Sequence, residues 1–144
     1  MIIDAHQHFW QLERGDYGWL MPDLASLYRD FMPDDLAPHL LQHDIEGTIL
    51  VQAAPTPAET EFLLDIADKT PFVLGIVGWT DFAAKSAASD IARLAKHPKL
   101  VGLRPMIQDI VDDDWMLRSV LTPAFEAMIQ CDLTFDALVL PRHL

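Results

Sequence analysis

Five short apolar segments recur along the chain and alternate with stretches of helical character, and this alternation restricts the fold more than any other feature. The apolar segments, which we predict to be strands, are 1–10, 47–52, 72–79, 100–105 and 133–139. Helices are predicted at 33–44, 57–69, 115–120 and 122–130, with an alanine-rich helix that ends near His97. Strands that alternate with helices form parallel sheets with right-handed crossovers. The pattern therefore predicts an α/β fold, and the lack of G-x-G-x-x-G after the first strand argues against dinucleotide binding.

The first apolar strand ends in two histidines that are one residue apart. Residues i and i+2 of a strand point to the same face, so His6 and His8 should share a face, with Cα atoms about 6.5 Å apart. Two imidazoles placed in this way can chelate one cation or bind one substrate oxygen. A lone His-x-His usually has no function. This pair, however, lies where a strand passes into a loop, which is where parallel α/β proteins keep their sites.

Polar residues also occur at the ends of the other predicted strands. Gln52 ends the second, Trp79 the third and Arg104 the fourth, while Asp136 lies in the fifth. Each has a simple structural explanation: a glutamine can cap the next helix, an arginine can pair with a nearby aspartate, and the backbone can satisfy a buried aspartate. Apolar strand interiors with polar carboxyl ends are nevertheless the distribution expected of a barrel with its active site at that face.

Three further local patterns predict structure. The connection 11–32 is long and rich in aromatic residues, so it is either a functional lid or a segment that its aromatic side chains pack down. The sequence Thr56-Pro57-Ala58-Glu59 fits a capping box with proline at the first helical position. Gly75 and Gly78 within the third strand indicate close approach of a neighbouring element.

Composition excludes several classes of partner. The 144 residues suffice for one domain with a core. The formal net charge of −12 argues against nucleic acid or an anionic membrane surface as partner, since both favour Lys and Arg. No apolar run reaches the roughly 20 residues of a membrane helix, and no secretory signal precedes the first strand. Cys131 is the single cysteine, so we expect no intrachain disulfide and a reducing, cytoplasmic location.

Several motifs, taken in order, resemble one protein family. They are Ile3-Asp4-Ala5-His6-Gln7-His8-Phe9-Trp10, Tyr17-Gly18-Trp19-Leu20, Val51-Gln52, Gly75-Ile76-Val77-Gly78-Trp79, Gly102-Leu103-Arg104 and Leu133-Thr134-Phe135-Asp136. Together they resemble the amidohydrolase-related proteins of the sugar-lactonase and 2-pyrone-4,6-dicarboxylate-lactonase type, over essentially the whole chain. The resemblance implies a (β/α)₈ barrel of the TIM type. It also implies hydrolysis of a lactone, typically a sugar-acid γ-lactone such as fucono- or rhamnonolactone.

The resemblance also implies roles for individual residues. His6 and His8 would be catalytic and would hold a divalent metal ion, with zinc as the first candidate. Some members of the group work without metal, which implies the alternative that the histidines polarise the lactone carbonyl directly. The substrate-binding residues would be Trp19, Gln52, Trp79, Arg104 and Asp136.

The chain departs from the family in length. A (β/α)₈ barrel takes about 250 residues, whereas this chain supplies five of the eight strands in 144 residues. We therefore expect residues 1–144 to be the N-terminal portion of one barrel domain, without the later strands that bring a further histidine and the general-base aspartate. Loss of that base alone would lower the rate roughly 10²–10⁴-fold, so the chain by itself should be inactive or nearly so. Open sheet edges would favour a homo-oligomer or a complementary C-terminal half.

Two alternative functions remain. A metal-dependent amidohydrolase or decarboxylase of the wider superfamily shares the His-x-His strand, although the Tyr17–Leu20 segment and Gln52 favour a lactonase. The other alternative is a non-catalytic fragment that acts through oligomerisation or binding. The absence of a bound metal and of a formed pocket would favour it.

Overall fold

The computed structural model describes residues 1–144, and its five strands form one parallel sheet. The strands are β1 (Ile3–Gln7), β2 (Gly47–Val51), β3 (Val73–Gly78), β4 (Leu100–Leu103) and β5 (Thr134–Phe135). They pair in chain order, and every pair is parallel. The predicted parallel α/β architecture with five strands is therefore confirmed, and the sheet forms about half of a barrel.

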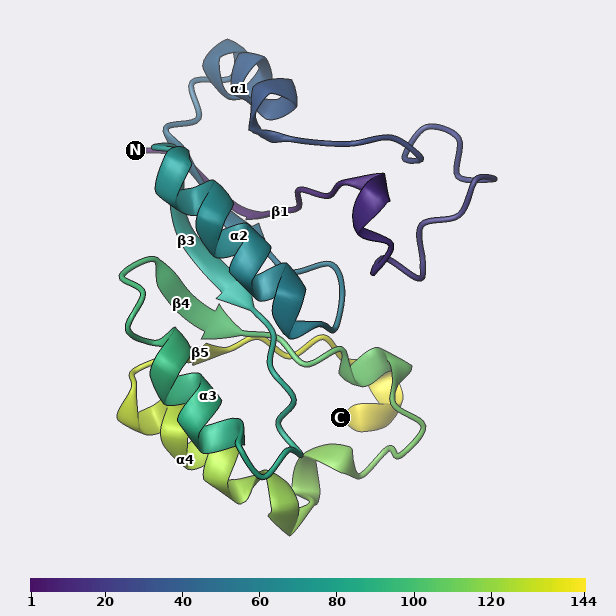
Figure 1. The fold of residues 1–144 in the computed structure, drawn as a ribbon, viewed down its shortest axis with the longest axis vertical. Helices are drawn as coiled ribbons and strands as arrows, with labels where there is room; N and C mark the ends of the chain where they lie inside the picture. Colours follow the sequence, from purple (N-terminus) through teal and green to yellow (C-terminus); the bar gives the residue numbers. More distant parts are fainter.

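Helices lie between the strands along the chain. They are α1 (Pro33–Gln42), α2 (Pro57–Lys69), α3 (Ala87–Leu94) and α4 (Thr122–Gln130). In Figure 1 the arrows of β3 and β4 point toward the right of the view, where the long connections that follow β1 and β4 extend. The polar strand ends therefore lie on the side of these connections. No helix has the length and apolarity needed to cross a membrane.

The main core fills the space between the sheet and its covering helices. Leu50 of β2, Ile76 of β3 and Leu103 of β4 are completely buried in it. Leu63 of α2 and Ile91 of α3 are equally buried against them. Burial of this apolar surface supplies the main driving force for the layered arrangement.

A second, smaller cluster packs the long connection after β1 against the end of β2. It consists of Trp10, Tyr17, Leu20, Ala53 and Ala54. Part of the connection is thus held by its aromatic side chains, as one of the two predicted alternatives requires. Trp19 and Tyr28 of the same connection remain partly exposed, at 38% and 41%.

Gly78 confirms the predicted close approach to β3. A Cβ atom there would lie 2.7 Å from Cγ2 of Thr60 in α2, so no larger residue fits without displacement of the Thr60 side chain. The hydroxyl group of Thr60 also accepts a hydrogen bond from the Trp79 amide and donates one to the Trp79 carbonyl, both at 2.8 Å. The glycine therefore lets α2 fix the end of β3.

Three predicted boundaries are wrong for physical reasons. The fifth strand covers two residues instead of 133–139, because its neighbour β4 ends ahead of Pro105, which has no N–H group for a ladder. The helix predicted at 115–120 forms two 3₁₀ turns, separated by Arg118 in an extended conformation. Such a short segment offers too few hydrogen bonds for a stable α-helix. The alanine-rich helix ends at Leu94, before His97.

Candidate active site

The two histidines at the end of β1 converge. His6 lies in β1 and His8 lies just beyond it. Their Nε2 atoms are 3.2 Å apart, and their rings are nearly perpendicular. The pairing of β1 with β2 is irregular between Asp4 and Gln7, so the pair does not follow an ideal strand. The structure nonetheless brings both imidazoles to one point.

The hydrogen bonds of His8 define which of its nitrogens carries the proton. Nδ1 lies 2.7 Å from the carbonyl oxygen of Val51, which can only accept, so Nδ1 is the donor and Nε2 presents a lone pair. Burial lowers the pKa of His8, although the Val51 bond opposes this effect, and the neighbouring Arg104 and His6 lower the pKa further. His8 is therefore a neutral imidazole near pH 7.

Arg104 approaches the histidine pair from the end of β4. Its Nη1 lies 3.2 Å from Nε2 of His6, and its Nη2 donates to the backbone carbonyl of Gln52. Because a guanidinium only donates, His6 Nε2 presents a lone pair toward it. Burial lowers the pKa of Arg104, which is 5% exposed, but nearby carboxylates oppose this change. A guanidinium stays charged at physiological pH, so the site contains a fixed positive charge.

A cavity of about 710 Å³ opens beside these groups. His8 and Arg104 line it together with Asp16 and Trp19 from the long connection and Asp109 from the loop after β4. The volume lies within the roughly 300–1,000 Å³ typical of small-molecule sites. A predicted binding residue, Trp19, is thus part of the wall, whereas Asp16 and Asp109 had no sequence signal of their own.

Three other predicted site residues lie behind or beside this wall. Gln52 is completely buried, and its Nε2 donates to the Arg104 carbonyl at 2.8 Å, so it holds the backbone of the arginine. Trp79 lines a neighbouring hollow. The Asp136 amide donates to the Leu103 carbonyl, and the Asp136 charge opposes the lowering of the Arg104 pKa by burial. Direct contact of these three side chains with substrate stays a prediction.

Only one of the two hydrogen bonds of the predicted capping box forms at the start of α2. Thr56 Oγ1 accepts a hydrogen bond from the Glu59 amide at 3.1 Å, as the motif requires. The Glu59 carboxylate does not return to the Thr56 amide. It accepts instead from the amides of Ala53, at 2.9 and 3.1 Å, and Ala54, at 2.6 Å. These two amides lie beyond the end of β2, and a buried N–H group needs a partner.

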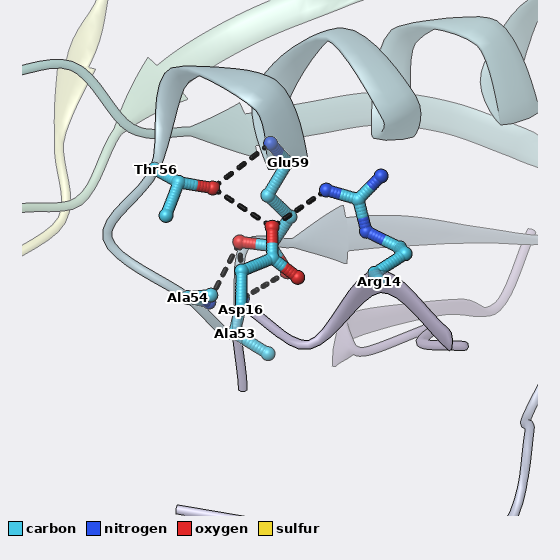
Figure 2. A network of polar contacts seen from close by, with 6 residues as sticks. All are labelled: Arg14, Asp16, Ala53, Ala54, Thr56 and Glu59. Atoms are coloured by element: carbon cyan, nitrogen blue, oxygen red, sulfur yellow. Dashed lines mark hydrogen bonds and ion pairs between the residues drawn. The ribbon is translucent and has the colours of Figure 1, made fainter. Parts of the chain in front are cut away.

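Asp16 joins this buried network from the long connection (Figure 2). Its Oδ2 accepts from the hydroxyl group of Thr56 at 2.9 Å and pairs with the Arg14 guanidinium at 2.6 Å. Burial raises the pKa of Glu59 to about 7, the charge of Asp16 adds to this, and the two amides and Arg14 oppose it. Burial and the charge of Glu59 also raise the pKa of Tyr17. Sequence patterns missed this network, since its partners lie 40 residues apart.

The histidine pair fits part of a metal site. Two nitrogens bound to one tetrahedral zinc ion at about 2.0–2.1 Å would be about 3.3 Å apart, close to the 3.2 Å between the His6 and His8 nitrogens. No three His, Cys, Asp or Glu residues of this chain cluster in a way that could hold a metal ion. Arg104 also donates to His6 Nε2, so an ion would have to displace that hydrogen bond. The residues present therefore supply two coordination positions.

A parallel sheet with outer helices and a polar site at the carboxyl ends of its strands defines the class of the α/β barrels. Within that class, the amidohydrolase family matches residues 3–143. The chain therefore belongs to the amidohydrolase family, which confirms the resemblance seen in the sequence motifs.

Individual relatives agree with this assignment. The L-fucono-1,5-lactonase of Burkholderia ambifaria is 51% identical over 142 residues, which cover 99% of this chain and 49% of that protein. The crystal structure of a zinc-bound amidohydrolase from Burkholderia multivorans has a TM-score of 0.90 at 32% identity, over 99% of this chain and 50% of that one. A probable 2-pyrone-4,6-dicarboxylic acid hydrolase of Acinetobacter baumannii shares the fold, with a TM-score of 0.72 at 15% identity over 94% of this chain and 48% of that one. The chain spans about half the length of the curated relatives it matches.

Proposed function

We propose that this chain forms the N-terminal half-barrel of a lactone hydrolase that opens the ring of a sugar-acid lactone. The proposal rests on the convergence of His6, His8 and Arg104 beside one cavity. Similarity to two Burkholderia proteins named L-fucono-1,5-lactonase, at 51% and 36% identity, supports the substrate class. L-fucono-1,5-lactone is therefore the first substrate to test; it is a six-membered δ-lactone, unlike the γ-lactone expected from the sequence motifs.

The fixed charge of Arg104 would act on the lactone carbonyl. As water attacks the carbonyl carbon, negative charge develops on the carbonyl oxygen, and a preorganised donor stabilises it. Arg104 is held in place by burial and by its bond to the Gln52 carbonyl. Its Nη1 would release His6 and donate a hydrogen bond to the lactone carbonyl oxygen instead. The ring C–O bond then breaks, and the ring oxygen takes the proton that the attacking water has given up to a general base.

The histidines would orient the water and the substrate. The bond from His8 Nδ1 to Val51 keeps the Nε2 lone pair directed at the cavity side, where it can accept a hydrogen bond from water or a sugar hydroxyl. The family resemblance implies that the general base is an aspartate of a later strand. The half-barrel would thus contribute substrate binding and charge stabilisation, and the complementary half the proton acceptor.

The same two Nε2 lone pairs could instead bind zinc, with His6 and His8 as its ligands in place of hydrogen bonds to water or substrate. The spacing of their Nε2 atoms supports this, as does the bound zinc in the related Burkholderia multivorans amidohydrolase. Such an ion, when bound, would polarise the lactone carbonyl. Its other protein ligands would come from the complementary half of the barrel.

A chimeric barrel tests the function directly. Residues 1–144 would be joined to the C-terminal half of the Burkholderia ambifaria lactonase, whose N-terminal half is 51% identical. We expect hydrolysis of L-fucono-1,5-lactone, measured as acid release with a pH indicator. H8A and R104M should lower kcat/KM by roughly 10²-fold or more, since each removes a group that contacts the reacting centre.

The matched control is E61Q on α2, because Glu61 pairs with Arg93 on the outer surface and lies outside the cavity. It should keep the full rate. A chimera that folds by circular dichroism but shows no lactonase activity would contradict the proposed function. The isolated chain should be slower than the chimera by roughly 10²–10⁴-fold, the typical contribution of a general base.

A further inference from the structure

The position of Trp19 in the cavity wall depends on the loop that follows β2. Its indole Nε1 donates to the Ala53 carbonyl at 2.8 Å, and its ring contacts Trp10 edge to face, with centroids 5.4 Å apart. The side chain is 38% exposed, so burial alone does not hold it. The indole is therefore held by the Ala53 carbonyl together with its aromatic neighbours, and a shift of Ala53 would remove its hydrogen bond.

Glu59 fixes Ala53 from the opposite side. Its completely buried carboxylate accepts the amides of Ala53 and Ala54, and no solvent reaches that carboxylate as a substitute partner. The peptide that receives the Trp19 indole is thus held by a residue in the first turn of α2. Core residues of α2, such as Leu63, in turn hold this helix in the main hydrophobic core.

Asp16 gives the long connection a second attachment to the same loop. Its carboxylate accepts the Thr56 hydroxyl, and Thr56 in turn accepts the Glu59 amide (Figure 2). Arg14 closes the network by pairing with Asp16 and lying 4.3 Å from the ring centroid of Phe62. Asp16 and Trp19 are separated by only two residues, so both attachments act on one stretch of the connection.

We propose that Asp16, Thr56 and Glu59 are positioning residues that fix Trp19 as a wall of the cavity, and so shape the space for substrate. That this space takes a lactone rests on the proposed function; the positioning itself does not. A simple helix cap would need only the bond that the Glu59 amide donates to the Thr56 hydroxyl group. The additional bond from Thr56 to Asp16, and the burial of a carboxylate at the end of β2, are accounted for by fixation of the connection.

Hydrogen exchange of the Trp19 indole N–H, followed by NMR on the 144-residue chain without substrate, tests the positioning. In D16A and T56V the exchange should be roughly fivefold to tenfold faster, the effect of one net hydrogen bond, because each variant lacks one partner of the bond between Thr56 and Asp16. T56S keeps the hydroxyl group and should restore slow exchange. D23A is the matched control, because Asp23 is an exposed aspartate of the same connection.

The amide of Ile76 in β3, which donates to Lys99 at 2.7 Å, reports global opening in the same spectra. Faster exchange of Trp19 with an unchanged Ile76 supports the proposal. Unchanged Trp19 exchange in D16A would overturn it. Parallel acceleration of both sites would also overturn it, because the network would then stabilise only the fold as a whole.

Kinetic measurements on the chimeric barrel provide a separate test of the positioning of Trp19. A displaced Trp19 wall weakens substrate binding more than chemistry. T56V, at a residue that does not line the cavity, should therefore raise KM by about fivefold to tenfold and leave kcat within about twofold. A fall in kcat with constant KM would contradict the assignment. If the chimera has no lactonase activity at all, the proposed function fails while the exchange experiment still decides the positioning.

Discussion

Replacement of Glu59 by glutamine should remove a defined part of the pH dependence of stability. Burial raises the pKa of this carboxyl group from an ordinary 4.5 to about 7, so the folded chain binds the proton more tightly than the unfolded chain. The protonated group contributes its full stabilisation below about pH 4.5. That contribution is lost as the pH rises to about 7, where the folded carboxyl group ionises, and it changes no further above that value.

The two pKa values set the size of the effect. They differ by about 2.5, and one pKa unit corresponds to about 1.4 kcal/mol, so the free energy of unfolding should fall by about 3 kcal/mol between pH 4.5 and pH 7.5 because of this group. Glutamine cannot titrate. Its oxygen can take the place of Oε2, which accepts from both the Ala53 and the Ala54 amides. Its NH₂ group then stands where Oε1 accepts from the Ala53 amide at 2.9 Å, so E59Q also carries a loss of about 1–3 kcal/mol from that bond.

Urea unfolding followed by far-ultraviolet circular dichroism, at intervals from pH 4.5 to 8, measures both effects. The quantity of interest is the difference between the unmodified chain and E59Q, in which titrations elsewhere in the chain cancel. E61Q, an exposed glutamate of the same helix, should follow the unmodified chain at every pH. If the curves of E59Q and the unmodified chain run parallel over this range, the buried carboxyl group does not titrate as the structure implies.

Three further perturbations test separate parts of the structure. Calorimetry should show weak zinc binding that R104M strengthens, since Arg104 donates to the His6 nitrogen that the ion needs; equal affinities would exclude this competition. G78A should destabilise the chain by about 1–3 kcal/mol, because its Cβ would lie 2.7 Å from the Thr60 side chain, and the measurement is a lower Tm. An unchanged Tm would mean that Thr60 can move aside at no cost in free energy. Native mass spectrometry should show a homo-oligomer, or a complex with a complementary half, since β1 exposes Ile3 at the sheet edge; a monomer at all concentrations would refute edge association.

Local patterns predicted the parts of the fold that local forces determine. The continuous apolar run of β2 is almost wholly buried, and the proline and threonine at the start of α2 occupy the positions that their chemistry predicts. The length of β5 depends instead on how far β4 offers paired backbone groups, and β4 ends ahead of Pro105. That limit comes from a different strand, so the sequence of 133–139 alone does not contain it.

The candidate site also has features that the local sequence predicts and features that depend on distant strands. His6 and His8 are two positions apart, so strand geometry predicts that they share a face. The approach of their Nε2 atoms to 3.2 Å occurs where β1 departs from regular pairing, which the local sequence does not contain. Gln52 also ends a strand, but its amide reaches the Arg104 carbonyl two strands away, and this contact depends on how the sheet curls.

Glu59 shows why local rules fail where two of them compete. A capping box would turn its carboxylate back to Thr56. The Ala53 and Ala54 amides, however, are buried beside it just beyond β2 and donate to no backbone carbonyl. A solvated helix start can leave its amides to water, whereas a buried amide left unpaired costs about 1–3 kcal/mol. The carboxylate therefore goes to the loop, at the expense of its own ionisation. Because that choice depends on burial by the long connection, the sequence around Glu59 predicts the helix cap and not the residue that fixes the cavity wall.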